Sequence, residues 1–184
     1  HRIALYGQEG VGKSQLASQF PKPLFIDFGG STGRLNVNRV KPPTTWLDTE
    51  ATIRSLMADP PAGYETLVFD ECDTMMRFIQ EHVVKHHPAK EGVAAVSIES
   101  FGWGKGYSIV AEYTAKLLDM LNALQEKTGW HIVLIFHASL GRVDLPEEDG
   151  SYDRWEPNIE RRPNRGENAQ GLIKAWAHSI YFAA

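Results

Sequence analysis

The sequence predicts an α/β domain in which helices cover both faces of a mostly parallel β-sheet. Short apolar segments typical of buried strands alternate with segments of helical periodicity along the chain. A phosphate-binding motif at 7–14 lies between the first predicted strand and the first predicted helix. Another apolar strand, later in the chain, ends in the acidic pair Asp70 and Glu71. With 184 residues, the chain is long enough for one such domain, which we place at 1–184.

The motif at 7–14 reads Gly-Gln-Glu-Gly-Val-Gly-Lys-Ser and fits G-x-x-x-x-G-K-[ST]. Its glycines can take positive φ and bring backbone N–H groups close to phosphate oxygens. The N-terminus of the following helix also favours negative charge. We expect Lys13 to contact the β- and γ-phosphates of ATP and the Ser14 hydroxyl to bind Mg²⁺. The expected nucleotide-binding residues are Gly7, Gln8, Glu9, Gly10, Val11, Gly12, Lys13, Ser14 and Gln15.

The segments on either side of the motif support this interpretation. Residues 3–6 are an apolar run typical of a buried strand. Residues 15–20 predict a helix with Leu16 and Phe20 on one face, and Pro21 ends it. An ordinary glycine-rich turn is the alternative, and it does not require this strand–loop–helix order.

Residues 24–27 predict a second buried strand, and the glycine-rich turn at 28–34 lies beyond its carboxyl end. Ligands of open α/β sheets bind at the carboxyl ends of strands, so we expect this turn near the nucleotide. A flexible connector is the alternative. Further along, the pattern favours a short strand at 44–47 and then a helix with Asp48 or Thr49 as its N-cap.

The apolar strand at 66–69 carries Asp70 to its carboxyl tip. A carboxylate there can hold Mg²⁺, usually through water. We expect Glu71 to orient or deprotonate the attacking water, and a solvated loop acid is the alternative. Asp73 is expected to cap the following helix, and Cys72 to be a small core residue.

The middle of the chain predicts two helices joined by a loop. The first, at 74–87, carries His82 and His86 at the spacing of metal ligands, but no third ligand is evident. Histidines also suit the negative end of a helix, which is the interpretation we favour. Residues 88–103 predict a long loop, and 106–127 a long helix with an apolar stripe.

A further buried strand is predicted at 131–137, and its last residue, His137, is placed to sense the γ-phosphate. A hydrogen-bonded structural histidine is the alternative. Residues 138–151 predict a polar loop. Residues 153–159 predict an edge strand, because Pro157 is poorly tolerated in a central one.

Composition limits the classes of function. The 42% hydrophobic content is that of a soluble globular protein, and the net charge of −4 argues against a wholly basic nucleic-acid coat. Cys72 is the only cysteine, so the chain favours a reducing compartment such as the cytoplasm. We expect neither a signal peptide nor a membrane span. A basic segment at 161–165, a helix near 168–176 and a strand at 179–184 complete the chain, whose ends look trimmed.

Several more particular segments resemble one family. They are 101–107, the strand that ends in His137, 152–157 and 174–183. Together with the two phosphate-site motifs, they resemble the phage-encoded RecA-like ATPases associated with single-strand annealing proteins, also called phage nucleotide-binding proteins. The resemblance implies a RecA-like P-loop NTPase fold and Mg²⁺-dependent ATP hydrolysis. It also implies action on single-stranded DNA in phage recombination, in the host cytoplasm.

The resemblance has consequences for catalysis. RecA-like proteins often carry a catalytic Glu just after the second strand, where this chain has Gly29. Either Glu71 supplies the base, or hydrolysis is weak. Such sites usually lie between subunits, which implies a homo-oligomer and a trans-acting finger from Arg161 or Arg162, with Lys105 in reserve. A solvated basic turn or a DNA contact is the alternative for these arginines. A single-strand-binding protein is a further implied partner.

Three other functions remain open. A helicase-loader-type AAA+ ATPase also uses an Asp-Glu pair, but it would need a helical lid where this chain has its final strand. A small-molecule kinase would need an arginine-rich lid, which the segment at 161–165 could supply. A nucleotide-dependent interaction module would bind ATP with little turnover.

Overall fold

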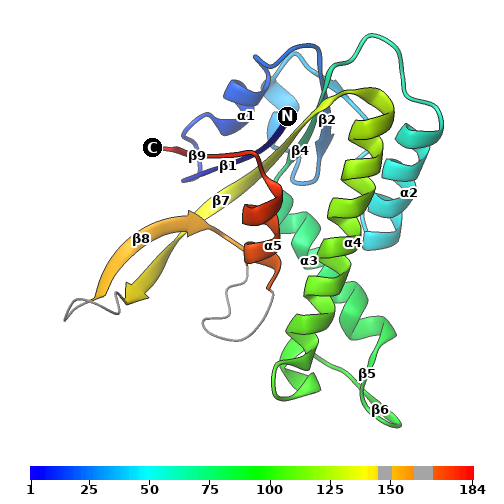
Figure 1. The fold of residues 1–184 in the computed structure, drawn as a ribbon, viewed down its shortest axis with the longest axis vertical. Helices are drawn as coiled ribbons and strands as arrows, with labels where there is room; N and C mark the ends of the chain where they lie inside the picture. Colours follow the sequence, from blue (N-terminus) through cyan, green and yellow to red (C-terminus); the bar gives the residue numbers. More distant parts are fainter. Residues whose placement is uncertain (145–150, 160–167) are drawn as a thin grey trace.

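The computed structural model describes residues 1–144, 151–159 and 168–184 (Figure 1). Its centre is a seven-stranded sheet with the strand order β3-β2-β4-β7-β1-β9, and β8 pairs with β7 off this path. Every neighbouring pair along the path is parallel, and only β8 runs antiparallel to its partner. The mostly parallel sheet predicted from sequence is therefore confirmed. The strands are β1 (Arg2–Gly7), β2 (Pro23–Asp27), β3 (Asn38–Arg39), β4 (Thr66–Asp70), β7 (His131–Asp144), β8 (Ser151–Pro157) and β9 (Ser179–Ala183).

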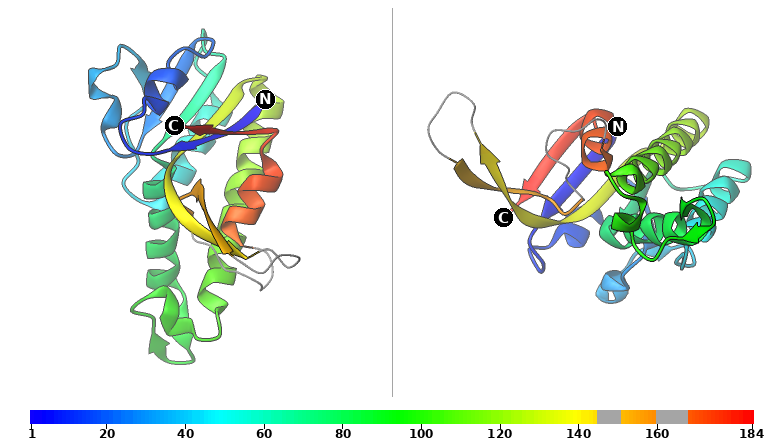
Figure 2. Two further views of the ribbon diagram at one scale, coloured as in Figure 1. Left: turned by 90° about the vertical axis from the view of Figure 1, so that its left-hand side faces the viewer. Right: turned by 90° about the horizontal axis from the view of Figure 1, so that it is seen from below.

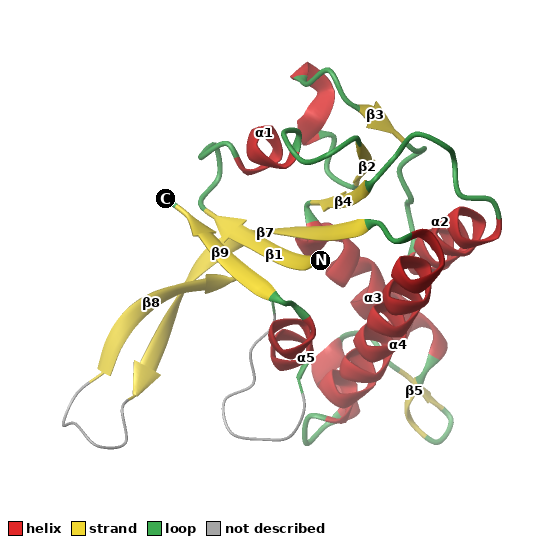
Figure 3. Ribbon diagram, turned by 45° about the horizontal axis from the view of Figure 1, so that its top comes forward, coloured by secondary structure: helices red, strands yellow, loops and turns green. Residues whose placement is uncertain are grey.

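Helices cover the two faces of the sheet unequally (Figure 3). The larger core lies between the sheet and four helices, α2 (Trp46–Ala58), α3 (Cys72–His86), α4 (Lys105–Thr128) and α5 (Ala169–Trp176). The opposite face carries the short helix α1 (Lys13–Ala17), which buries Ala17 and leaves Leu16 52% exposed. No helix within the described ranges is both long and apolar enough to cross a bilayer.

Alternation along the central strands explains why they read as continuous apolar runs. In β4, Leu67 and Phe69 face the larger core, whereas Val68 faces the smaller one. In β7, Leu134 faces the larger core and Ile135 faces the smaller one. A strand has a side-chain period of two, so both sets must be apolar when both faces are covered.

The predicted strand at 44–47 is wrong, because α2 begins there. Thr45 is the N-cap, and its hydroxyl accepts a hydrogen bond from the Asp48 backbone N–H at 3.1 Å. The cap starts the helix early enough to bury Trp46 completely in the larger core. Asp48 instead accepts a hydrogen bond from the Thr44 hydroxyl at 2.6 Å, in the first turn, where an acid is favourable.

The predicted loop at 138–151 is wrong over its first half. Beyond His137, β7 continues to Asp144 and pairs with β8 as an antiparallel hairpin, from Ala138 opposite Pro157 onward. This hairpin extends away from the helices (Figure 2). Its residues are too polar to resemble a buried strand, which is why the sequence pattern suggested a loop.

The predicted loop at 88–103 also contains regular structure. The short hairpin of β5 (Pro88–Lys90) and β6 (Val93–Ala94) is followed by the 3₁₀ helix η2 (Ile98–Phe101). A second 3₁₀ helix, η1 (Ser31–Arg34), lies in the glycine-rich turn after β2.

We predict that Thr45→Ala lowers the free energy of unfolding by about 1 kcal/mol, because the Asp48 N–H loses its capping partner. Urea denaturation of the purified protein measures this. Thr52→Ala, on the same helix but without a capping role, is the control and should change stability by less than about 0.5 kcal/mol. Equal effects of the two substitutions would contradict the capping assignment.

Candidate functional site

The candidate site lies where the parallel strands end together. Gly7 at the end of β1 pairs with His137, the last residue of β7 before the hairpin. Asp27 at the end of β2 pairs with Asp70 at the end of β4. A cavity of about 720 Å³ opens at this edge. Its lining comes from the phosphate loop, from the turn after β2 and from the tips of β4 and β7.

The glycines of the phosphate loop serve different needs. Gly10 and Gly12 have φ of 78° and 89°, a left-handed conformation that side chains disfavour. Gly7 instead lies against β9, where a Cβ atom would overlap the Ala183 carbonyl oxygen. Six of the residues expected to bind nucleotide line the cavity directly, and they are Glu9, Gly10, Gly12, Lys13, Ser14 and Gln15. Val11 is not part of this lining.

The Lys13 ammonium lies within the curve of the loop. Its Nζ donates hydrogen bonds to the carbonyl oxygens of Gly7 at 2.9 Å and Gln8 at 2.7 Å. Burial lowers the pKa of this amine, and nearby acids, Asp70 foremost, oppose the shift. The loop therefore holds a cation where phosphate oxygens would lie against the backbone N–H groups.

Asp70 is only 1% exposed, and burial raises the pKa of its carboxyl group. The Ser31 hydroxyl donates to its Oδ2 at 3.0 Å, and the Ser14 hydroxyl also hydrogen-bonds to this carboxylate. Hydroxyl and carboxylate oxygens are the hard ligands that Mg²⁺ prefers, and a bound cation would offset the buried charge. Ser14 and Asp70 therefore fit Mg²⁺, with the remaining ligands coming from phosphate and water.

The turn after β2 is built to present Ser31. The Asp27 carboxylate accepts hydrogen bonds from the backbone N–H groups of Gly30, Ser31 and Thr32. On the other side, Arg39 donates to the carbonyls of Thr32 and Leu35. The sequence placed this turn near the nucleotide but missed these roles. An Asp at a strand end with Gly-Gly-Ser-Thr beginning two residues later is a typical signal for such side-chain capping.

Glu71 and Gly29 fit one another. Glu71 has a left-handed backbone, with φ of 61°, and its carboxylate lies over the Gly29 backbone. A Cβ atom at Gly29 would overlap that carboxylate. Burial raises the pKa of Glu71, while His137 opposes the shift. The glycine that departs from the RecA-like pattern thus makes room for a carboxylate from the neighbouring strand.

The sequence predicted that Asp73 caps α3, and this prediction is wrong. The N-cap position is Glu71, whose side chain makes no capping hydrogen bond. Asp73 lies in the first turn, and its Oδ2 accepts from the His137 backbone N–H at 2.9 Å and lies 3.2 Å from His137 Nδ1. With Nδ1 engaged, the imidazole can offer Nε2 to a ligand in the cavity.

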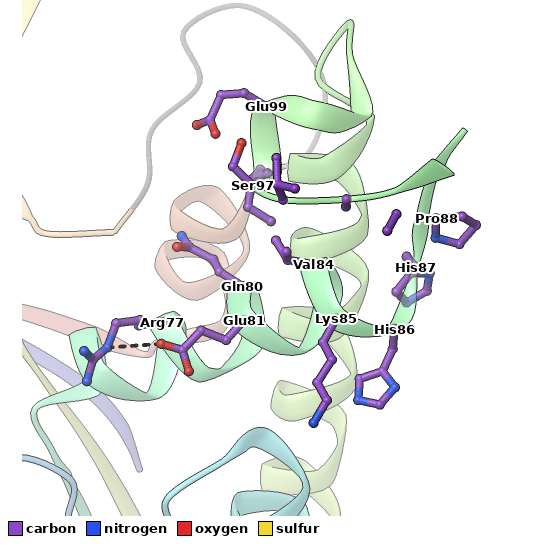
Figure 4. Close-up of a pocket in the computed structure, with 14 residues that line it drawn as sticks. Arg77, Gln80, Glu81, Val84, Lys85, His86, His87, Pro88, Ser97 and Glu99 are labelled. Atoms are coloured by element: carbon purple, nitrogen blue, oxygen red, sulfur yellow. Dashed lines mark ion pairs between the residues drawn. The ribbon is translucent and has the colours of Figure 1, made fainter. Parts of the chain in front are cut away.

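A second cavity of about 720 Å³ lies elsewhere, between the second half of α3, the β5–β6 hairpin and the start of η2 (Figure 4). Arg77 and Glu81 form an ion pair at 3.9 Å in its wall. The rings of His82 and His86 are 4.4 Å apart on the same helix. Within the described ranges, no group of three or more His, Cys, Asp or Glu side chains could hold a metal by itself.

The structure tests the expected finger role only for the reserve candidate Lys105. Arg161 and Arg162 lie outside the described residues. Lys105 is exposed at the first residue of α4 and is not part of the cavity lining.

Comparisons with known proteins agree with this architecture. A family model described as AAA domain, AAA_24, matches residues 1–176. The chain is 21% identical over 141 residues to the SPbeta prophage-derived uncharacterized protein YorG of Bacillus subtilis (strain 168). That match covers 74% of this chain and 41% of YorG, so the chain spans about two fifths of that relative's length.

Among solved structures, the chain is similar to the RadB recombinase, with a TM-score of 0.53 and 12% identity. The match covers 98% of this chain and 73% of the RadB chain. At this identity the likeness shows the fold, which is that of a RecA-like P-loop protein.

We predict that Gly29→Ala displaces the Glu71 carboxylate while the fold and nucleotide binding persist. Misplacing a reacting group by about 1 Å can cost roughly 10²-fold, so ATP hydrolysis should fall on that scale. A crystal structure, ATP affinity and turnover of the variant check this. Gly33→Ala, in the same turn, is the control because a Cβ atom there meets nothing within 4 Å. An unmoved Glu71 or normal turnover in Gly29→Ala would show that the close fit has no catalytic consequence.

Proposed function

The chain belongs to the AAA domain family AAA_24, and on this premise we propose that it hydrolyses Mg-ATP at the strand-tip cavity while acting on single-stranded DNA. One observation carries the proposal. The phosphate loop, the buried Asp70 and the acid Glu71 line a single cavity at the carboxyl edge of a parallel sheet. The family and the fold support nucleotide binding. The proposal adds ATP hydrolysis and action on single-stranded DNA.

In this proposal the loop binds the phosphates through its backbone N–H groups and through Lys13. Ser14 and Asp70 hold Mg²⁺, which neutralises charge that develops on the phosphate oxygens. Ser31 keeps the Asp70 carboxylate oriented through their 3.0 Å hydrogen bond.

Glu71 is the proposed general base for the attacking water. Its carboxylate lines the cavity one residue after Asp70, so a base and a metal ligand share one strand tip. Burial raises the pKa of Glu71, which strengthens a carboxylate as a base. His137 is the proposed γ-phosphate sensor, and Asp73 fixes the orientation of its ring.

The proposal that single-stranded DNA is the partner has three supports. One structural neighbour is a recombinase, the curated relative is prophage-derived, and four segments resemble phage annealing-associated ATPases. The β7–β8 hairpin, which begins directly after His137, is the proposed contact element. It exposes Tyr152 by 43%, and aromatic side chains of this kind stack on bases; the neighbouring Leu140 is 62% exposed and adds apolar surface.

A helicase-loader-type ATPase is the second candidate, favoured by the AAA description of the family model. It would use the same cavity and the same acids, so the site geometry does not separate the two. Stimulation of turnover by single-stranded DNA separates the recombination role from a small-molecule kinase and from an interaction module with little turnover. The resemblance also leads us to propose that the chain forms a homo-oligomer.

We predict that the purified chain hydrolyses ATP only with Mg²⁺, and faster when single-stranded DNA is present. Steady-state turnover with single-stranded DNA, double-stranded DNA and no DNA measures this. Lys13→Ala should lose tight ATP binding or turnover, with an unchanged circular dichroism spectrum, because Lys13 is the loop's own cation. Hydrolysis at the wild-type rate by Lys13→Ala would refute the phosphate-loop assignment. Equal rates with and without DNA would refute the DNA part.

We predict that Glu71→Gln still binds Mg-ATP but turns it over at least roughly 10²-fold more slowly, the usual scale for losing a general base. Glu112→Gln is the matched control, because Glu112 is exposed on α4 and is not part of the cavity lining. The control should keep most of its turnover. If both variants hydrolyse ATP normally, the base lies elsewhere and Glu71 is a loop acid.

A further inference from the structure

The geometry points to Arg34 as a catalytic residue that contacts the transferred phosphoryl group of ATP bound to the same chain. This inference rests on the proposed function of the cavity. It adds a second positively charged side chain to the proposed ATP site. Arg34 is the last residue of η1, in the turn after β2, and it lines the same cavity as the phosphate loop.

The charge of the cavity calls for a second cation. Among its described lining residues, Lys13 and Arg34 are the lysine and arginine side chains, against the acids Glu9, Asp70 and Glu71. Phosphoryl transfer spreads negative charge over the equatorial oxygens of the transferred group. Lys13 is held close to its own loop by two carbonyl hydrogen bonds. Arg34 is therefore the cation that can approach the phosphate from the other wall.

The turn that carries Arg34 has a fixed position. Asp27 holds the start of η1 through backbone N–H groups, at 2.7 Å for Gly30 and 3.1 Å for Thr32. Ser31, in the same short helix, donates to Asp70 at 3.0 Å. Ser31, which supports Asp70, and Arg34, the proposed phosphate contact, thus belong to the same 3₁₀ helix. Hydrogen bonds to Asp27 of β2 and Asp70 of β4 hold this helix in place.

Two arginines near this turn have different roles. Arg39 is engaged with the turn itself, through hydrogen bonds to the side chain and carbonyl of Thr32 and to the carbonyls of Leu35 and Val37. Arg34 is exposed, and no other described residue hydrogen-bonds or ion-pairs with its side chain. A guanidinium group presents a planar set of donors that matches phosphate oxygens. Arg39 therefore has a structural role, and Arg34 is available to a ligand.

This assignment differs from the trans-acting finger that the resemblance implies for Arg161 or Arg162. Arg34 lies on the same chain and in the same cavity as Lys13, so its action requires no neighbouring subunit. Turnover per chain should then show no dependence on a finger from a second copy.

Arg34→Ala tests the inference through turnover, ATP affinity and affinity for ADP–aluminium fluoride, an analogue of the transition state. We expect kcat to fall by ~10³-fold or more, the scale of an arginine finger, with ATP affinity changed only a few-fold. Affinity for the analogue should fall far more than affinity for ATP. Arg34→Lys should recover only part of kcat, since it keeps the charge but loses the planar donors. Arg77→Ala, an arginine on α3 outside this cavity, is the control and should keep wild-type turnover.

Subunit mixing separates action in cis from action in trans. Arg34→Ala mixed with Lys13→Ala should not regain turnover, because each chain lacks part of its own site. Rescue on mixing would overturn the assignment in cis, and loss of ATP affinity with unchanged kcat would make Arg34 a binding residue instead. Unchanged turnover in Arg34→Ala, or in Arg34→Gln if the alanine variant is poorly folded, overturns the inference alone. A wild-type chain without ATPase activity overturns the proposed function and this inference together.

Discussion

Parallel pairing of the central strands is the constraint on which the site depends. Because β1, β2, β4 and β7 run in one direction, their carboxyl ends meet at one edge. The register then sets Asp27 beside Asp70 and Gly7 beside His137. Backbone hydrogen bonds between the strands thus bring segments far apart in the chain to one cavity. A slip of one residue in any pair would turn the tip side chains toward the opposite face of the sheet.

Four acidic residues lie at or just beyond the strand tips, and the surroundings of each carboxylate differ. Asp27 accepts from backbone N–H groups, Asp70 from serine hydroxyls, and Asp73 from the His137 N–H. Glu71 has space because Gly29 lacks a side chain. Burial disfavours the charged form and so raises the pKa values of Asp70 and Glu71, while the serine hydroxyls oppose the shift at Asp70. Among the cavity lining, these acids are opposed by the lysine and arginine side chains of Lys13 and Arg34, and a bound Mg²⁺ would further relieve the repulsion among the acids.

Sequence patterns were sufficient for the fold and for the two phosphate-site motifs, because those depend on local order and on apolar strands. The patterns failed where tertiary contacts decide the outcome. Thr45 starts α2 because Trp46 is needed in the core, and β7 continues past His137 because β8 pairs with it. The contact between Asp73 and His137 joins residues from different elements, so local spacing could not reveal it. The fit of Glu71 to Gly29 was hidden for the same reason, although the missing Glu after β2 pointed to that position.

The continuity of β7 has a mechanical consequence. One strand runs without interruption from the buried sheet, through His137, into the hairpin, at about 3.3 Å per residue, so Asp144 lies roughly 23 Å beyond the imidazole. Such a strand can act as a lever whose pivot is His137, a residue of the cavity lining. A tilt at the pivot produces a displacement that grows along the hairpin in proportion to its length. One continuous backbone thus joins a residue of the cavity lining to a surface far from the cavity.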